Sequence, residues 1–252
     1  MFSSEPRAEG RHERGVSEVL AFILVFTIII GSVAIVSVIG LQSMNSYQEG
    51  EQLRNAERGF DALSDNFNDI IRYDGIKDRS GELNLRDGSI STDYEGTELT
   101  VTVEHTNGTT VYDETTTTGG LVYQSSRGSD TIAYEGGGIF RGDGEGSVAL
   151  EYPMIRCTDD RAVITILQIE PDARTFASSE TSRISISETN ATRETYTNVT
   201  DVQIDVGEDS EYKKGWDMVL ENRFDDGECS LDGGTVDGGT VTIHIVEAEI
   251  DL

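Results

Sequence analysis

An uninterrupted apolar run, residues 19–41, constrains this chain more than any other feature of its sequence. The run reads VLAFILVFTIIIGSVAIVSVIGL and contains no charged residue. A helix rises about 1.5 Å per residue, so a run of this length crosses the roughly 30 Å hydrocarbon core of a bilayer. We therefore expect residues 16–44 to form a transmembrane helix with membrane lipid as its partner.

The alternative is a secretory signal that is removed. Such signals have an apolar region of about 7–15 residues followed by a small-residue cleavage site, whereas QSMNSYQ follows this longer run. We favour a retained helix. Arg7, Arg11 and Arg14 precede it, and no Lys or Arg follows it before Arg54. The positive-inside rule then predicts a single-pass protein of the cell membrane, with a cytoplasmic leader at residues 1–15 and an extracellular C-terminal domain.

The composition is strongly acidic. The chain has 47 acidic and 19 basic residues, for a formal net charge of −28. This balance is typical of proteins from extreme halophiles, where molar salt shortens the Debye length to about 3 Å and screens self-repulsion. Nucleic acid is not an expected partner, because no basic patch could neutralise its phosphates.

An amphipathic helix is expected to extend the membrane helix outward over residues 45–74. Its apolar positions are spaced alternately by three and four residues, which is a helical stripe: Leu53, Ala56, Phe60, Leu63, Phe67 and Ile70. The stripe packs either on the protein's own β domain, which we favour, or on another subunit as a coiled-coil seam. Gly50 and Gly59 weaken the helix and predict a bend or break.

Residues 75–252 predict an acidic, extracellular, antiparallel all-β domain that resembles a sandwich, so that the fold class is α+β. Short runs rich in Val, Ile, Thr and Tyr alternate with Gly, Asn and Asp. Residues 99–112 contain two alternating runs on either side of Asn107-Gly108, and this dipeptide is a strong hairpin signal. Residues 162–169 predict a central strand, and residues 240–250 predict a last strand that closes the sheet. Further strands are expected at residues 82–85, 121–124, 131–134, 147–152, 183–187, 201–206 and 217–220. Residues 178–200 are expected to form a mobile loop around the one weak strand at 183–187, and residues 225–239 a turn-rich loop.

Two kinds of covalent site are expected outside the cell. Cys157 and Cys229 either form a disulfide, which an oxidising compartment favours, or remain buried thiols. Asn107-Gly-Thr, Asn190-Ala-Thr and Asn198-Val-Thr are N-glycosylation sequons. The hairpin turn by itself already explains Asn107.

We expect no enzymatic activity and no cofactor. The histidines, His12, His105 and His244, are scattered, and neither a G-x-S-x-G motif nor a phosphate loop occurs. His244 alternates with Ile243 and Ile245, which predicts a solvent-facing strand residue, and Trp216 is either a core or a surface-anchor aromatic. The acidic residues of the last loop miss the EF-hand spacing and predict no metal site: Asp225, Asp226, Glu228, Asp232 and Asp237.

The start of the apolar helix resembles a known family. Arg14-Gly15-Val16-Ser17-Glu18 followed by the helix is similar to the class III signal of archaeal type IV pilins, whose haloarchaeal members carry a similar R-G-V-S start. The resemblance implies that a prepilin peptidase cuts between Gly15 and Val16 and leaves the helix on the mature protein. Bacterial pilins carry a glutamate as the fifth residue of the mature chain, whereas Glu18 would be the third. Stabilisation of the helix start by a negative charge is enough to explain Glu18.

Three further segments resemble an uncharacterised haloarchaeal family of pilin-like membrane proteins: residues 55–63, 137–141 and 146–150. Together the two resemblances imply a cell-surface structural subunit with other pilin-like subunits as partners, in a surface filament. The main filament subunits of such families are usually smaller, so a minor or tip-like role is expected. The alternative is a membrane-anchored β domain that binds a ligand or partner and does not polymerise. Small residues at Gly31, Ala34, Ser37 and Gly40 fit close helix packing or ordinary transmembrane composition.

Overall fold

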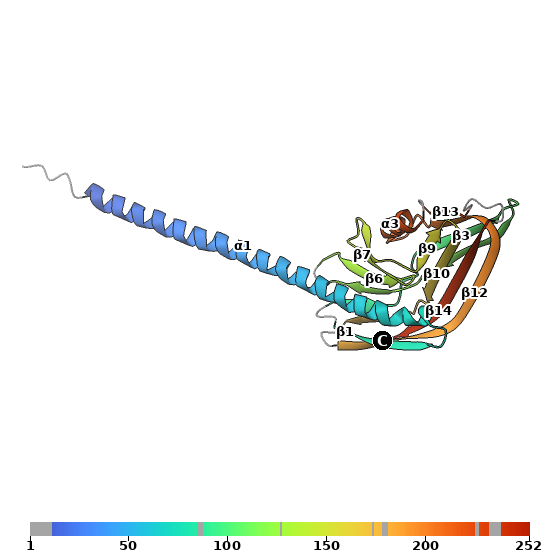
Figure 1. Ribbon diagram of the computed structural model, residues 1–252. Coiled ribbons are helices and arrows are strands. Elements are labelled where there is room, and N and C mark those ends of the chain that lie inside the picture. The colour runs from blue at the N-terminus through green and yellow to red at the C-terminus, as the bar shows by residue number, and fades with distance from the viewer. Residues whose placement is uncertain are drawn as a thin grey trace, which may run out of the picture. The chain divides into compact units, whose positions relative to one another are not determined.

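The computed structural model describes residues 12–84, 88–126, 128–172, 174–177, 181–224, 227–231 and 238–252. The chain divides into two units, one ending at Gly50 and the other beginning at Glu51. The predicted leader lies outside the described residues except for its last four. An N-terminal apolar helix precedes a mostly antiparallel β domain, which confirms the α+β class (Figure 1).

Helix α1 spans His12–Phe67 and contains the apolar segment Ser17–Met44, which is long and apolar enough to cross a membrane. The large apolar side chains of this segment are all exposed, by 52% at Ile23 up to 70% at Phe22 and Val36. Such an exposed apolar surface is unfavourable in water.

The helix does not break at the glycines, because α1 continues through both Gly50 and Gly59. A Cβ at Gly59 would overlap the side chain of Leu83, which lies on β1 (Asp78–Asn84). Glycine here allows a strand to approach the helix closely. The helix ends instead at Phe67, and a short helix α2 (Asp69–Arg72) follows.

The apolar stripe of the second unit is buried in its own β domain, which confirms the interpretation we favoured. No stripe residue is more than 6% exposed, and Phe60 and Phe67 are fully buried. The stripe shares one apolar cluster with strand residues such as Leu83 and Ile186. The period of the stripe therefore specified both the helix and the face that packs.

The larger sheet has the strand order β4-β3-β12-β14-β10-β9, with β1 and β13 also paired to β12. Its remaining strands are β3 (Glu98–His105), β4 (Thr110–Thr117), β9 (Ile155–Thr158), β10 (Arg161–Ile169), β12 (Thr181–Val206), β13 (Glu228–Ser230) and β14 (Gly239–Asp251). The hairpin around Asn107-Gly108 is confirmed by the β3–β4 pairing, and Gly108 has a φ of 77°.

Two expectations about this sheet are wrong. Strands β10 and β14 pair in parallel, with Ala162 opposite Val241, so the sheet is not antiparallel throughout. Strand β14 lies between β12 and β10 rather than closing an edge. The alternation of residues along a strand does not say which neighbour the strand takes in the sheet.

The smaller sheet has the order β11-β2-β5-β6-β7-β8. Its strands are β2 (Ser89–Ser91), β5 (Leu121–Gln124), β6 (Thr131–Glu135), β7 (Gly138–Gly142), β8 (Ser147–Glu151) and β11 (Thr175–Ala177). Every residue of β6 is buried. Ile132 and Tyr134 belong to the cluster of α1, whereas Ala133 and Phe140 belong to a second apolar cluster. The sheet therefore lies between two cores.

Helix α3 (Lys213–Arg223) belongs to the second cluster and replaces the strand expected at residues 217–220. The domain is therefore not all-β. Trp216, Val219 and Leu220 are buried at helical spacing, and Trp216 is a core aromatic.

The strand expected at residues 183–187 is confirmed, but the loop expected around it is wrong where the structure describes these residues. Residues from Thr181 onward belong to β12, which pairs with β14 from Ser185 to Val199. The many Thr residues that read as a polar loop are β-branched and suit a strand.

Candidate functional site

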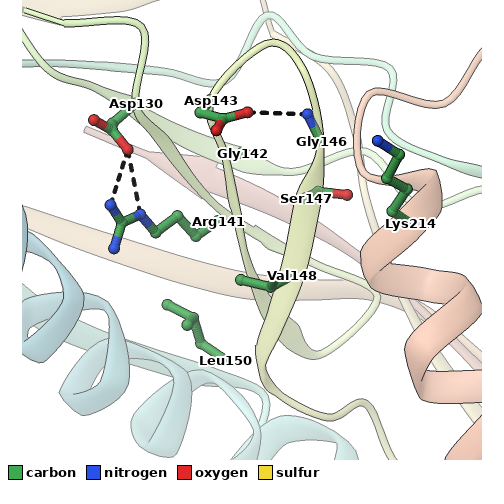
Figure 2. Close-up of a pocket in the computed structure, with 9 residues that line it drawn as sticks. All are labelled: Asp130, Arg141, Gly142, Asp143, Gly146, Ser147, Val148, Leu150 and Lys214. Atoms are coloured by element: carbon green, nitrogen blue, oxygen red, sulfur yellow. Dashed lines mark hydrogen bonds and ion pairs between the residues drawn. The ribbon is translucent and has the colours of Figure 1, made fainter.

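The β7–β8 hairpin borders an open pocket of about 360 Å³ (Figure 2). Its walls come from β7 and β8, from Asp130 before β6, and from Lys214 on α3. Cationic, anionic and apolar groups all line the pocket, and we take it as a candidate binding site.

Arg141 ties the pocket to helix α1. Its guanidinium donates to Asp130 Oδ1 at 3.0 Å and to Glu57 Oε1 at 3.0 Å. The side chain is 38% exposed, so each ion pair contributes little free energy, about 1 kcal/mol or less. The pairs nevertheless fix where the guanidinium points, between helix and hairpin.

The tip of the hairpin is held by side chains on both sides. Asp143 Oδ1 accepts hydrogen bonds from the backbone N–H groups of Glu145 and Gly146, each at 2.9 Å, and these bonds lower the pKa of Asp143. Lys214 Nζ donates to the backbone oxygen of Glu145 at 2.9 Å. Ser147 Oγ accepts from the backbone N–H of Gly215 at 2.9 Å, so α3 and the hairpin are fastened together.

Strand β8 presents an apolar surface between charged groups. Val148 and Leu150 are 42% and 45% exposed, and β8 is an end strand of its sheet. A second hollow of about 220 Å³ shares Leu150 and is lined by α1 residues such as Glu57 and Asp61. The two hollows form a surface suited to binding an extended or partly apolar group.

The three segments that resemble the pilin-like family meet at this place. Residues 55–63 lie on α1, residues 137–141 on the β6–β7 turn and β7, and residues 146–150 at the start of and along β8. Glu57, Arg141 and Leu150 come from these segments, one from each. No pattern in the sequence predicted that segments so far apart would adjoin.

A buried carboxylate, Glu135, forms a second polar centre that sequence reasoning missed. It is fully buried and accepts hydrogen bonds from Trp216 Nε1 at 2.5 Å, from Thr97 Oγ1 at 2.8 Å and from Thr118 Oγ1 at 3.5 Å. Among the described residues it has no ion pair with Lys or Arg. Burial raises the pKa of Glu135 to about 7, although the Trp216 and Thr97 hydrogen bonds act in the opposite direction.

The predicted disulfide is present. Cys157 on β9 and Cys229 on β13 are bonded, with their Cα atoms 5.9 Å apart. The bond joins parts of the chain 72 residues apart. The buried-thiol alternative is therefore wrong.

The predicted modification sites lie at accessible places. Asn107, Asn190 and Asn198 are all exposed, the first in the β3–β4 turn and the other two on β12. Asn107 Oδ1 accepts from the backbone N–H of Thr109 at 3.0 Å, as a turn residue does. The backbone of Arg14, Gly15 and Val16 is helical and belongs to α1.

The prediction for His244 is wrong, since it is only 8% exposed. In the sheet His244 lies between two neighbours, opposite Arg193 of β12 and Thr165 of β10. Burial lowers the pKa of His244, and the Arg193 charge lowers it further.

No group of three or more His, Cys, Asp or Glu side chains is placed to hold a metal ion in the part of the chain that the structure describes. Of the acidic residues in the last loop, Glu228 begins β13. Asp225, Asp226, Asp232 and Asp237 lie outside the described residues.

These features define a protein with one apolar N-terminal helix and a mostly antiparallel β domain bearing an open surface site. The chain belongs to DUF7289, a family of unknown function, whose profile matches residues 14–252. The match includes Arg14-Gly15-Val16, the apolar helix and the β domain. No curated protein and no solved structure matches the chain.

Proposed function

We propose that the protein is a pilin-like structural subunit of the cell surface, in a minor or tip-like position. The observation that carries the proposal is the apolar helix Ser17–Met44, whose large side chains are exposed and which lies within the family match. A segment shared by the family and unable to remain in water must be covered by lipid or by the helices of neighbouring subunits.

Charge and processing follow from the same helix. Arg7, Arg11 and Arg14 before it place the N-terminus in the cytoplasm and the β domain outside. A prepilin peptidase cuts after Gly15, and Val16 becomes the first residue. The Cys157–Cys229 disulfide supports the outward position, because disulfides persist in oxidising compartments. The net charge of −28 supports a salt-rich medium such as that of haloarchaea.

Dependence on the peptidase tests the proposal. The full chain is expressed in a halophilic host with and without prepilin peptidase, and its intact mass is measured. We expect loss of residues 1–15 only when the peptidase is present. A Gly15→Val substitution should block this loss, whereas Ser4→Ala in the same leader should not. Equal masses in both hosts would refute the pilin assignment.

A second candidate is a membrane-anchored binding domain that does not polymerise. The exposed Val148 and Leu150 beside Arg141 favour it, because charged groups bordering an apolar surface mark binding sites. An Ala34→Cys variant separates the two candidates. Oxidative cross-linking in the cell envelope should give a product with the mass of two chains if the apolar helices pack together, and only the single-chain band if each helix is an isolated tether.

A further inference from the structure

Strand β12 has an open edge in its middle. On one side it pairs with β14 from Ser185 to Val199. On the other side β1 covers residues 181–187 and β3 covers residues 199–206. Within the described residues, no strand pairs with residues 189–197 on that side. Figure 1 shows β12 as the long strand that passes from β1 to β3.

The ends of this gap are closed by backbone hydrogen bonds. The N–H of Glu188 donates to Lys77 O at 2.8 Å, and the N–H of Thr106 donates to Asn198 O at 2.9 Å. Between these points every residue is exposed except the half-buried Tyr196. The gap is therefore a bare stretch of strand bounded at both ends.

A bare edge of this kind is a place where a strand of another chain can pair. Proteins usually protect such edges with lysines, prolines or a covering segment. Residues 189–197, TNATRETYT, contain neither Lys nor Pro and are rich in Thr, a good strand former. Their charged residues are Arg193 and Glu194, and Arg193 already pairs with Asp74 at 3.1 Å. The side chains of the edge thus offer little protection.

A sequon lies at each end of the gap. The β12–β14 register shifts next to each sequon, at Thr189 just before Asn190-Ala-Thr and at Asn198 itself in Asn198-Val-Thr. Asn198 has a φ of 59°. Asn190 Nδ2 contacts Glu247 Oε1 at 3.1 Å on the surface. Both amide groups are exposed to a modifying enzyme.

We propose that Asn190 and Asn198 carry N-linked glycans that cover the open edge of β12 and prevent other strands from pairing with it. In the reaction the side-chain nitrogen forms a bond to the anomeric carbon of an oligosaccharide linked to a lipid phosphate. The bond between that carbon and the phosphate oxygen breaks, and the amide proton leaves with the lipid phosphate. The inference rests on the outward position of the β domain in the proposed function.

Peptide mass spectrometry of the protein from its native membrane tests the modification. We expect sugar masses on the peptides that contain Asn190 and Asn198, and an N-terminal peptide that begins at Val16. Unmodified asparagines beside a Val16 start would overturn this inference alone. Unmodified asparagines without a Val16 start would overturn it together with the proposed function.

The protective role is tested on full-length variants in detergent. We expect Asn190→Gln/Asn198→Gln to form larger assemblies than the wild type by light scattering, while the matched control Asn107→Gln keeps the wild-type mass. Adding Thr195→Lys to the double variant should restore that mass, because the lysine blocks edge pairing. A double variant that matches the control, or no rescue by the lysine, would overturn the protective role.

Discussion

The buried carboxylate Glu135 makes the stability of the β domain fall as the pH rises. Its pKa is raised from 4.5 to about 7 in the folded chain, chiefly by burial. Between these two values the folded state holds a proton that the unfolded state has released. The free energy of unfolding therefore decreases across this range, and the loss is complete above pH 7.

The magnitude follows from the same two values. One pKa unit corresponds to about 1.4 kcal/mol, so Glu135 removes about 3 kcal/mol of stability between pH 4.5 and pH 8. Glu135→Gln keeps the shape and an acceptor oxygen for Trp216 Nε1, but it does not titrate. We expect the variant to be about as stable as the wild type near pH 4.5 and about 3 kcal/mol more stable at pH 8.

Urea unfolding of the full chain in detergent measures this difference. Trp216 is the single tryptophan of the sequence and donates directly to Glu135, so its fluorescence reports on the site. The control is Glu221→Gln, which changes an exposed carboxylate on α3. The control should follow the wild-type pH dependence. If wild type and Glu135→Gln changed in parallel from pH 4.5 to pH 8, the reasoning about burial would be refuted.

Two further predictions concern the packing of the domain. Replacing the bonded pair Cys157 and Cys229 with alanine should lower the unfolding free energy by about 4 kcal/mol, because the unfolded chain regains the freedom of a long loop; an unchanged urea midpoint would contradict this. Phe60→Ala should cost about 3–5 kcal/mol, since Phe60 is fully buried where α1 meets the sheets, whereas Asp61→Ala on the exposed face of the same helix should cost far less. Equal urea midpoints for Phe60→Ala and Asp61→Ala would show that α1 does not anchor the domain.

Features with a local signal were predictable from the sequence. The stripe from Leu53 to Ile70 repeats with the helical period, and its residues are buried. Asn107-Gly108 determines its turn within four residues, because glycine accepts the positive φ that the turn requires. The cysteine pair follows from its being the only one in the sequence.

Features that depend on distant parts of the chain were not predictable. The parallel pairing of β10 with β14 joins residues about eighty positions apart. The residues of a strand do not indicate which other strand will pair with it. Helix α3 is short, and its Trp216, Val219 and Leu220 stripe is too brief to outweigh strand-forming residues. Glu135 is one of many acidic residues, and its hydrogen-bond donors come from Thr97, Thr118 and Trp216.

The surface site shows the same division. The sequence singled out the segments that supply Glu57, Arg141 and Leu150 by their resemblance to one family. It could not show that an ion pair at 3.0 Å joins the first two, because that contact requires the folded arrangement of α1 and β7.

The first residue of the protein in its native membrane tests the account most directly. A processed pilin-like subunit starts at Val16 and retains the apolar segment Ser17–Met44. A chain that starts at Met1 would show that the leader is not removed and that the helix is a membrane anchor without pilin processing. A chain that starts beyond Leu41 would show that the helix is a discarded signal, and it would contradict the central claim.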